Sequence, residues 1–224
     1  MSWHHASIVG SEASGPGLRW MRLQVPQAVA LSFRVPGQFV KLRVGGFEAH
    51  FAIASAPGGS CFEFFVRTNG DAAQAWSALP LGSIVEMTLA EGPGFPIDQL
   101  KGRDLLLVGT GTGWAPLRSV VLAIRKRRHD FKRVDGLYGA LTPEHVVFEE
   151  EFEGYKADQI NVRVTVTEPI GTWAGPIGRV QALLPADQLA NTTALLVGQP
   201  EMTAEVTSML ISRGLSPAHA WLNF

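Results

Sequence analysis

The chain has 224 residues, of which 46% are hydrophobic and 17% are charged, enough for one large domain or two small ones with proper cores. A formal net charge of −1 gives no electrostatic reason to bind nucleic acid or an anionic membrane. The single cysteine, Cys61, excludes an internal disulfide and an iron–sulfur cluster held by several thiolates of this chain.

Two further exclusions concern metals and membranes. The six histidines include adjacent His4 and His5, but no histidine spacing is typical of a metal site, so we expect none. No apolar run approaches the roughly 20 residues that cross a bilayer, and the first residues lack the pattern of a secretion signal. We therefore expect a soluble, cytoplasmic protein with no membrane span.

The first hundred residues contain short β-like runs bounded by Gly, Pro, Ser or Asn. Six such runs predict an antiparallel six-stranded β-barrel in residues 1–100. The predicted strands are residues 4–10, 18–25, 38–44, 49–55, 61–67 and 83–89.

The pattern changes near residue 100, where buried strands begin to alternate with helices. This alternation predicts a parallel sheet with helices on both faces, in a second domain of residues 101–224. The predicted strands are residues 104–109, 134–140, 162–167, 193–198 and 219–224, and the predicted helices are residues 115–128, 144–155, 201–214 and a short one near 178–185.

The first strand of this second domain leads into the glycine-rich stretch "GTGTGWAPLRS", residues 109–119. A dinucleotide fingerprint of the G-x-G-x-x-G type fits in neither register, because Pro116 or Trp114 occupies the last place. Glycines nevertheless allow a tight turn with bare amides, and Pro116 suits the first turn of a helix. The loop therefore predicts an anion site, best matched to a dinucleotide pyrophosphate, with a ligand-free strand–helix turn as the alternative.

Several blocks together carry a family resemblance. A barrel comes first, then "GTGTGWAPLRS", "LYGALTPEHVVFEEEF", "VGQPEM" and a terminal aromatic residue, Phe224. This order resembles the ferredoxin–NADP reductase family, which pairs a flavin-binding barrel with a nicotinamide-binding α/β domain. The resemblance implies that a hydride passes from a nicotinamide to a flavin, which passes electrons on singly or as a pair.

The flavin motif of the family is only partly present. An Arg, any residue, an aromatic and a Ser or Thr align with Ala49, His50, Phe51 and Ala52, so only the aromatic remains. The resemblance implies that Phe51 stacks on the flavin and that the amides of Ala52 and Ile53 bond its polar edge. The alternative is that Phe51 is a core residue of a barrel strand.

A second block implies where the flavin phosphates bind. "FFVRTNGDAAQAW" resembles the strand, glycine turn and short helix of the family, which places the phosphates at residues 70–73. Arg67 at the strand end is a candidate for the charge missing at Ala49, or else an exposed, solvated side chain. We expect FAD, with FMN as the minor alternative.

At the nicotinamide end, "LLVGQPEM" resembles a family block in which Val197 replaces a cysteine. Gln199 and Phe224 are predicted at the reacting centre, with Phe224 either covering the flavin face or ending a buried strand. The residues expected to contact the cofactors are Phe51, Ala52, Ile53, Val66, Arg67, Gly70, Asp71, Ala72, Ala73, Thr110, Gly111, Thr112, Gly113, Pro116, Tyr138, Gly139, Gly198, Pro200, Met202 and Phe224.

Two classes of function follow from the resemblance. The first is an NAD(P)H-dependent flavoprotein reductase that feeds an external acceptor, expected to be a protein, with a free-flavin reductase as a lesser variant. The second is a binding or regulatory module that has lost flavin turnover, suggested by Ala49, Ala52 and Val197. NADH is slightly favoured over NADPH, because Leu141 and Thr142 occupy the places expected to bind a 2′-phosphate.

Overall fold

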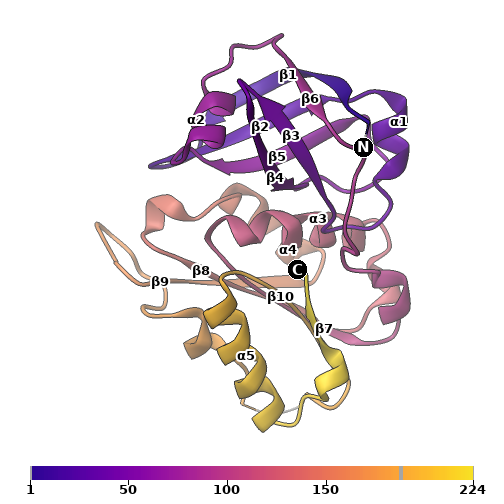
Figure 1. Ribbon diagram of the computed structural model, residues 1–224. Coiled ribbons are helices and arrows are strands. Elements are labelled where there is room, and N and C mark those ends of the chain that lie inside the picture. The colour runs from indigo at the N-terminus through magenta and orange to yellow at the C-terminus, as the bar shows by residue number, and fades with distance from the viewer. Residues whose placement is uncertain (1, 187–188, 224) are drawn as a thin grey trace.

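The first sheet of the protein is a nearly closed antiparallel barrel (Figure 1). The computed structural model describes residues 2–186 and 189–223. The strands run in the order β4-β3-β6-β1-β2-β5, and the two edge strands meet where Ala54 N donates to Glu63 O over 2.7 Å. This confirms the predicted six-stranded barrel, whose strands are β1 (His4–Ala13), β2 (Leu18–Gln24), β3 (Phe39–Val44), β4 (Phe47–Ala52), β5 (Cys61–Arg67) and β6 (Ile84–Met87).

Alternation along the strands fills the barrel. Val40 and Leu42, two residues apart on β3, belong to the same buried core as Met21 of β2 and Phe64 of β5, as a period of two requires. Two short helices, α1 (Gln27–Ser32) and α2 (Asp71–Ser77), accompany the barrel, and α2 inserts Trp76 into its core.

The second sheet is parallel and five-stranded, in the order β11-β10-β7-β8-β9. The chain starts at the centre with β7, runs outward through β8 and β9, and then crosses to β10 and β11 on the other side. The order therefore reverses between β7 and β10, which is where open α/β sheets bind ligands. The strands are β7 (Asp104–Thr110), β8 (Val134–Ala140), β9 (Ile160–Val166), β10 (Thr192–Val197) and β11 (Ala220–Leu222).

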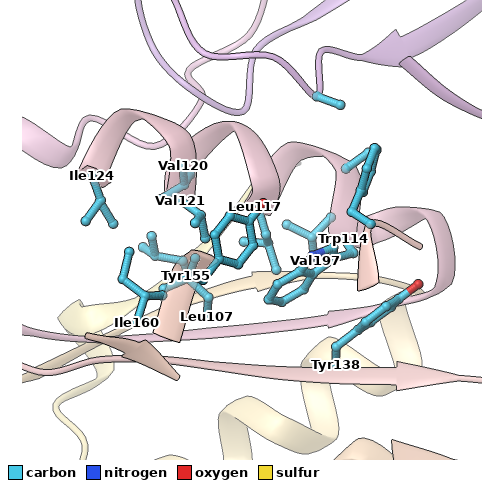
Figure 2. Packing of buried hydrophobic residues seen from close by; sticks show 14 of the residues in the cluster. Leu107, Trp114, Leu117, Val120, Val121, Ile124, Tyr138, Tyr155, Ile160 and Val197 are labelled. Carbon is cyan, nitrogen blue, oxygen red and sulfur yellow. The ribbon is translucent and has the colours of Figure 1, made fainter. Parts of the chain in front are cut away.

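Helices cover both faces of this sheet. The helices α3 (Trp114–Arg125) and α4 (Phe152–Ala157) lie on the face toward the barrel, and α5 (Pro200–Ser212) lies on the other (Figure 1). Successive side chains of β7 lie on opposite faces of the sheet: Leu107 packs against residues of α3, and Val108 packs against residues of α5. Figure 2 shows the first of these layers, with the side chains of α3 directed onto the sheet.

Two predicted helices differ in the structure. Residues 144–155 are interrupted, because Phe148 adopts a left-handed conformation with φ 58° and packs its ring 5.3 Å from that of Phe65 in the barrel. A tertiary contact thus overrides the local preference, and only α4 remains as α-helix. The helix expected near 178–185 is a 3₁₀ segment, Val180–Leu183.

One hydrophobic cluster spans the barrel and the α/β unit, beside the separate core inside the barrel. Leu18, Phe65 and Phe95 belong to the same buried cluster as Leu117 of α3 and Phe148. Among residues 2–186 and 189–223, no helix has the length and apolar character needed to cross a membrane, and no three His, Cys, Asp or Glu side chains form a metal-binding group.

Candidate functional site

A cleft of about 1630 Å³ lies between the barrel and the carboxyl edge of the parallel sheet. The loops that follow β7 and β10 form one wall, at the point where the strand order reverses. The barrel supplies the facing wall from β3, β4 and the end of β5. Of the predicted contacts, the cleft brings together Ala52, Arg67, Thr110, Gly111, Thr112, Gly113, Pro116, Gly139, Gly198, Gln199, Pro200 and Met202.

The glycine-rich loop turns directly into α3. Gly111 has φ +54°, which glycine adopts without a Cβ penalty, and residues 111–113 form a 3₁₀ turn ahead of Trp114. No side chain caps this turn or the start of α3. Gly111, Thr112 and Gly113 line the cleft just ahead of the helix start, so an anion site here would be formed by the amides of this turn together with the positive end of α3.

The loops after β7 and β10 touch each other through glycines. A Cβ added to Gly113 would lie 2.8 Å from the carbonyl oxygen of Val197, and one added to Gly198 would lie 2.8 Å from Thr110 Oγ1. Glycine is therefore required here by the contact between the two loops, and not only by the approach of a ligand.

Arg67 bridges the two walls of the cleft. It ends β5 in the barrel, yet a Cβ added to Gly111 would lie 2.8 Å from Arg67 Nη2. Among the residues that the structure describes, no salt bridge involves Arg67. A guanidinium at this place is available to an anionic ligand that lies between the barrel and the loop.

The barrel wall presents His50 rather than Phe51. The His50 ring packs edge-to-face on Phe39 with centroids 5.1 Å apart, and both line the cleft. Phe51 pairs with Val40 on the opposite face of β4, and its ring lies 4.5 Å from that of Trp76. The structure thus favours the core interpretation of Phe51. Strand alternation puts residues 50 and 52 on one face, which is the signal that would have selected His50.

Several predicted flavin contacts also lie away from the cleft. The amide of Ile53 donates to Gln38 O over 3.0 Å, so it is engaged within the barrel, and the Val66 side chain is buried in the barrel core. The α2 helix has only seven residues and begins with Asp71, so its start offers little to a phosphate. Gly70, Asp71, Ala72 and Ala73 are not among the lining residues.

Tyr138 is a core residue in this structure. Its ring stacks on Trp114 with centroids 5.0 Å apart, and its hydroxyl donates to His145 O and accepts from Val147 N. Burial raises the pKa of the Tyr138 phenol above its usual range. The predicted contact of Tyr138 with a cofactor is therefore not supported by its packing, whereas its neighbour Gly139 does line the cleft.

The end of the cleft beyond β8 and β9 carries few charges. Leu141 is exposed and lines it, while Thr142 is buried with its hydroxyl 2.7 Å from His145 Nδ1. Arg179 is a cation that sequence patterns did not select, and it lines the cleft beside Val180. The basic run 125–128 is elsewhere, since three of its residues line a separate hollow with Lys132 and Asp158.

The last described residues bring the final strand to the barrel. Asn223 is buried, lines the cleft and donates from Nδ2 to Gly37 O over 3.0 Å. This bond ties the end of β11 to the turn before β3. Phe224, predicted to cover the flavin face, lies outside the described residues.

The cleft fits an elongated anionic ligand. Its volume exceeds the roughly 300–1,000 Å³ of pockets for drug-sized molecules, and it has uncapped amides on one wall and Arg67 on the other. These features suit a nicotinamide dinucleotide and FAD. The Arg and the Ser or Thr of the family's flavin motif are replaced by Ala49 and Ala52. On the barrel side, the groups that remain to contact a flavin are therefore Arg67, Ala52 and His50.

Comparisons with known proteins agree with this geometry. Residues 107–208 match the family model of the oxidoreductase NAD-binding domain. The chain is 31% identical over 195 residues to the sulfhydrogenase 1 subunit gamma of Pyrococcus furiosus, covering 84% of this chain and 66% of that subunit. The chain thus spans slightly less than two thirds of this relative.

Solved structures share the two-domain fold. A ferredoxin NADP+ reductase from Neisseria gonorrhoeae, with bound FAD and NADP, superposes with a TM-score of 0.79 at 20% identity, over 96% of this chain and 92% of that one. An Amycolatopsis cytochrome P450 reductase superposes with a TM-score of 0.87 at 20% identity, over 99% of this chain and 69% of that one.

Proposed function

We propose that this chain, which has the fold of a solved ferredoxin NADP+ reductase and matches the oxidoreductase NAD-binding domain over residues 107–208, is an NAD(P)H-dependent flavoprotein reductase of the ferredoxin–NADP reductase family. It takes a hydride from NAD(P)H onto bound FAD and passes electrons to an external acceptor, which we propose is a protein. The observation that carries the proposal is the cleft, in which the uncapped start of α3 and the loop after β10 face the barrel across Arg67.

In this proposal, residues 101–224 bind the nicotinamide dinucleotide. The amides of Gly111 to Gly113 bind the pyrophosphate, and the positive end of α3 adds to this attraction. Gln199 and Pro200 begin α5 at the neighbouring loop and shape the pocket for the nicotinamide. The Val197 side chain replaces a thiol, so its contribution is packing alone.

Residues 1–100 bind FAD in this proposal. Arg67 neutralises phosphate charge, and the wall of His50, Phe39 and Ala52 receives the ring system. When bound, FAD supplies the chemistry of accepting a hydride and releasing electrons singly or as a pair. The chain itself would orient the two rings toward each other, and such orientation is a large part of what a protein can contribute to a transfer reaction.

A second candidate function rests on the barrel side of the cleft. Phe51 packs inside the barrel, the Ile53 amide is engaged, and α2 is short, so few groups hold a flavin in place. These observations favour a binding or regulatory module that takes a nicotinamide dinucleotide and has weak or no flavin turnover. The cytoplasmic location remains a prediction from the sequence.

One experiment separates the two functions. The freshly purified protein, and the same protein after incubation with FAD, is examined for a flavin absorption spectrum and then mixed with NADH without oxygen. The reductase predicts a flavin spectrum that NADH bleaches. A colourless protein that takes up no FAD, yet still binds NADH in a titration, supports the binding module and refutes the reductase.

A further inference from the structure

A buried arginine, outside the cleft itself, links the barrel to the α/β unit. Arg118 on α3 has a side chain that is 8% exposed and reaches across the domain interface to the barrel. We propose that Arg118 is a positioning residue: it fixes the α3 loop relative to the barrel and thereby sets the spacing of the two cofactor half-sites. Its kinetic consequence rests on the proposed reductase function.

The contacts of Arg118 span both units. Nη1 donates to Glu63 Oε2 over 2.5 Å and to Ala54 O over 3.1 Å, both in the barrel. Nε and Nη2 donate to the two carboxylate oxygens of Glu151 over 2.8 and 2.5 Å, within the α/β unit. The guanidinium also lies 4.3 Å above the ring of Phe148. The planar guanidinium of Arg118 thus donates to three groups, two in the barrel and one in the α/β unit. We call this arrangement the Arg118 clamp.

Arg118 and its two partners in the barrel are close in sequence to cleft residues. Arg118 is five residues beyond Gly113, about one and a half helical turns along α3. Glu63 precedes Arg67 on β5, and Ala54 lies two residues beyond Ala52, the last residue of β4. A small displacement of the guanidinium is therefore transmitted over short, rigid elements to the loop and the barrel wall of the cleft.

A neighbouring hydrogen bond runs in parallel. Ser119, fully buried, donates from Oγ to Ser55 O over 2.6 Å. Arg118 and Ser119, adjacent on α3, thus donate to the carbonyl oxygens of Ala54 and Ser55, which are adjacent in the barrel. Two such directional bonds fix the rotation of α3 as well as its distance from the barrel.

Ion pairing keeps the Arg118 guanidinium charged despite its burial. Desolvation opposes the charged form, but the hydrogen bonds and charges of Glu151 and Glu63 outweigh it and raise the pKa of Arg118. The guanidinium of Arg118 therefore stays charged in the folded protein. A buried ion pair of this kind is weak evidence for stability, and its better attested use is to specify one arrangement of the chain.

The competing explanation is that the shared hydrophobic core alone fixes the two domains. Apolar contact is non-directional and tolerates sliding, whereas a guanidinium bonded to three acceptors does not. The two explanations differ in what removal of the guanidinium does to the distance between the domains.

The first measurement is that distance and needs no cofactor. With Cys61→Ser, spin labels are placed at Ala28→Cys on α1 and Ser208→Cys on α5, both exposed positions. Pulsed electron spin resonance then gives the distribution of label separations. Arg118→Met and Glu63→Gln should broaden or shift it. Arg125→Met is the matched control, because Arg125 lies on the same helix but pairs with Asp158 within the α/β unit.

The second measurement is the rate at which NADH bleaches bound FAD in rapid mixing, together with the dissociation constant for NADH. Arg118→Met and Glu63→Gln should slow bleaching at least about 10-fold while the dissociation constant changes less than about 3-fold, because alignment is lost and binding groups are intact. Arg125→Met should match the native protein in both.

The label distributions and the bleaching rates together decide whether Arg118 positions the two domains. Native label distributions in both clamp variants, or altered distributions with native bleaching rates, would overturn the proposal. If Arg118→Met does not fold, the near-isosteric Glu63→Gln decides by the same two measurements. If the native protein takes up no FAD, the reductase function fails, and the label distributions by themselves support or overturn the clamp.

Discussion

Substitution of Gly113 tests the contact between the two cofactor loops. Gly113 has helical backbone angles, φ −63° and ψ −14°, so alanine adopts them without strain and gains about 0.4–1 kcal/mol from the unfolded state. Its Cβ, however, would lie 2.8 Å from Val197 O and 3.2 Å from Val197 C, which are backbone atoms that cannot rotate away. Overpacking of this kind costs about 1–3 kcal/mol. The difference is a net destabilisation of about 0–2.6 kcal/mol, with a middle value of about 1.3 kcal/mol.

The functional effect should exceed the loss of stability. To relieve the overlap, the glycine loop and the loop after β10 must separate by a few tenths of an ångström, and both line the cleft. Misalignment of reacting groups is costly, so we expect NADH to bleach bound FAD about 10-fold more slowly in Gly113→Ala. Stability and rate are both affected because the close contact is with the protein itself.

Thermal unfolding, NADH titration and rapid mixing measure these effects. Gly102→Ala is the control, because Gly102 has φ +73° and open space around its Cβ and lies outside the cleft. It should lose stability by about 1–2 kcal/mol through its left-handed backbone and keep native affinity and rate. A Gly113→Ala protein with native affinity and bleaching rate would refute the reasoning.

Four further predictions follow from the cleft and the core. Arg67→Gln should weaken FAD or NADH binding by about 10-fold or more, through loss of a charged hydrogen bond, with a nearly unchanged unfolding temperature; native affinity for both would contradict the bridging role. NADH should serve at least as well as NADPH in steady-state kinetics, and a clear NADPH preference that Arg179→Ala abolishes would reverse this. If Phe224 covers the flavin, Phe224→Ala should alter the flavin spectrum and tighten nicotinamide binding without loss of stability; a large loss with a native spectrum would place it in the core. Burial raises the pKa of Tyr138, so its neutral phenol should contribute to the free energy of unfolding below about pH 10, and this contribution should be lost as the pH rises further. In Tyr138→Phe, the free energy of unfolding should therefore fall less steeply with alkaline pH, as denaturant titration at several pH values measures.

The sequence by itself determined the two architectures and the position of the glycine loop. Runs with a period of two, closed by turn residues, require a surface buried on one side, and they gave the six barrel strands. Apolar runs such as residues 104–109 must be covered on both faces, so they gave the parallel sheet. The glycines at 111 and 113 and Pro116 marked the turn into α3 because their backbone requirements are local.

Only the tertiary structure decided which groups meet in the cleft. The reversal of strand order between β7 and β10 comes from packing of whole elements, and it brings Gly113 against Val197 across more than eighty residues of chain. Period-two alternation separates His50 from Phe51, but which of them faces the core depends on Trp76 from another element. The hydrogen bonds of Arg118 likewise form only when β5 and the segment after β4 lie beside α3, because a directional bond depends on the positions of both partners.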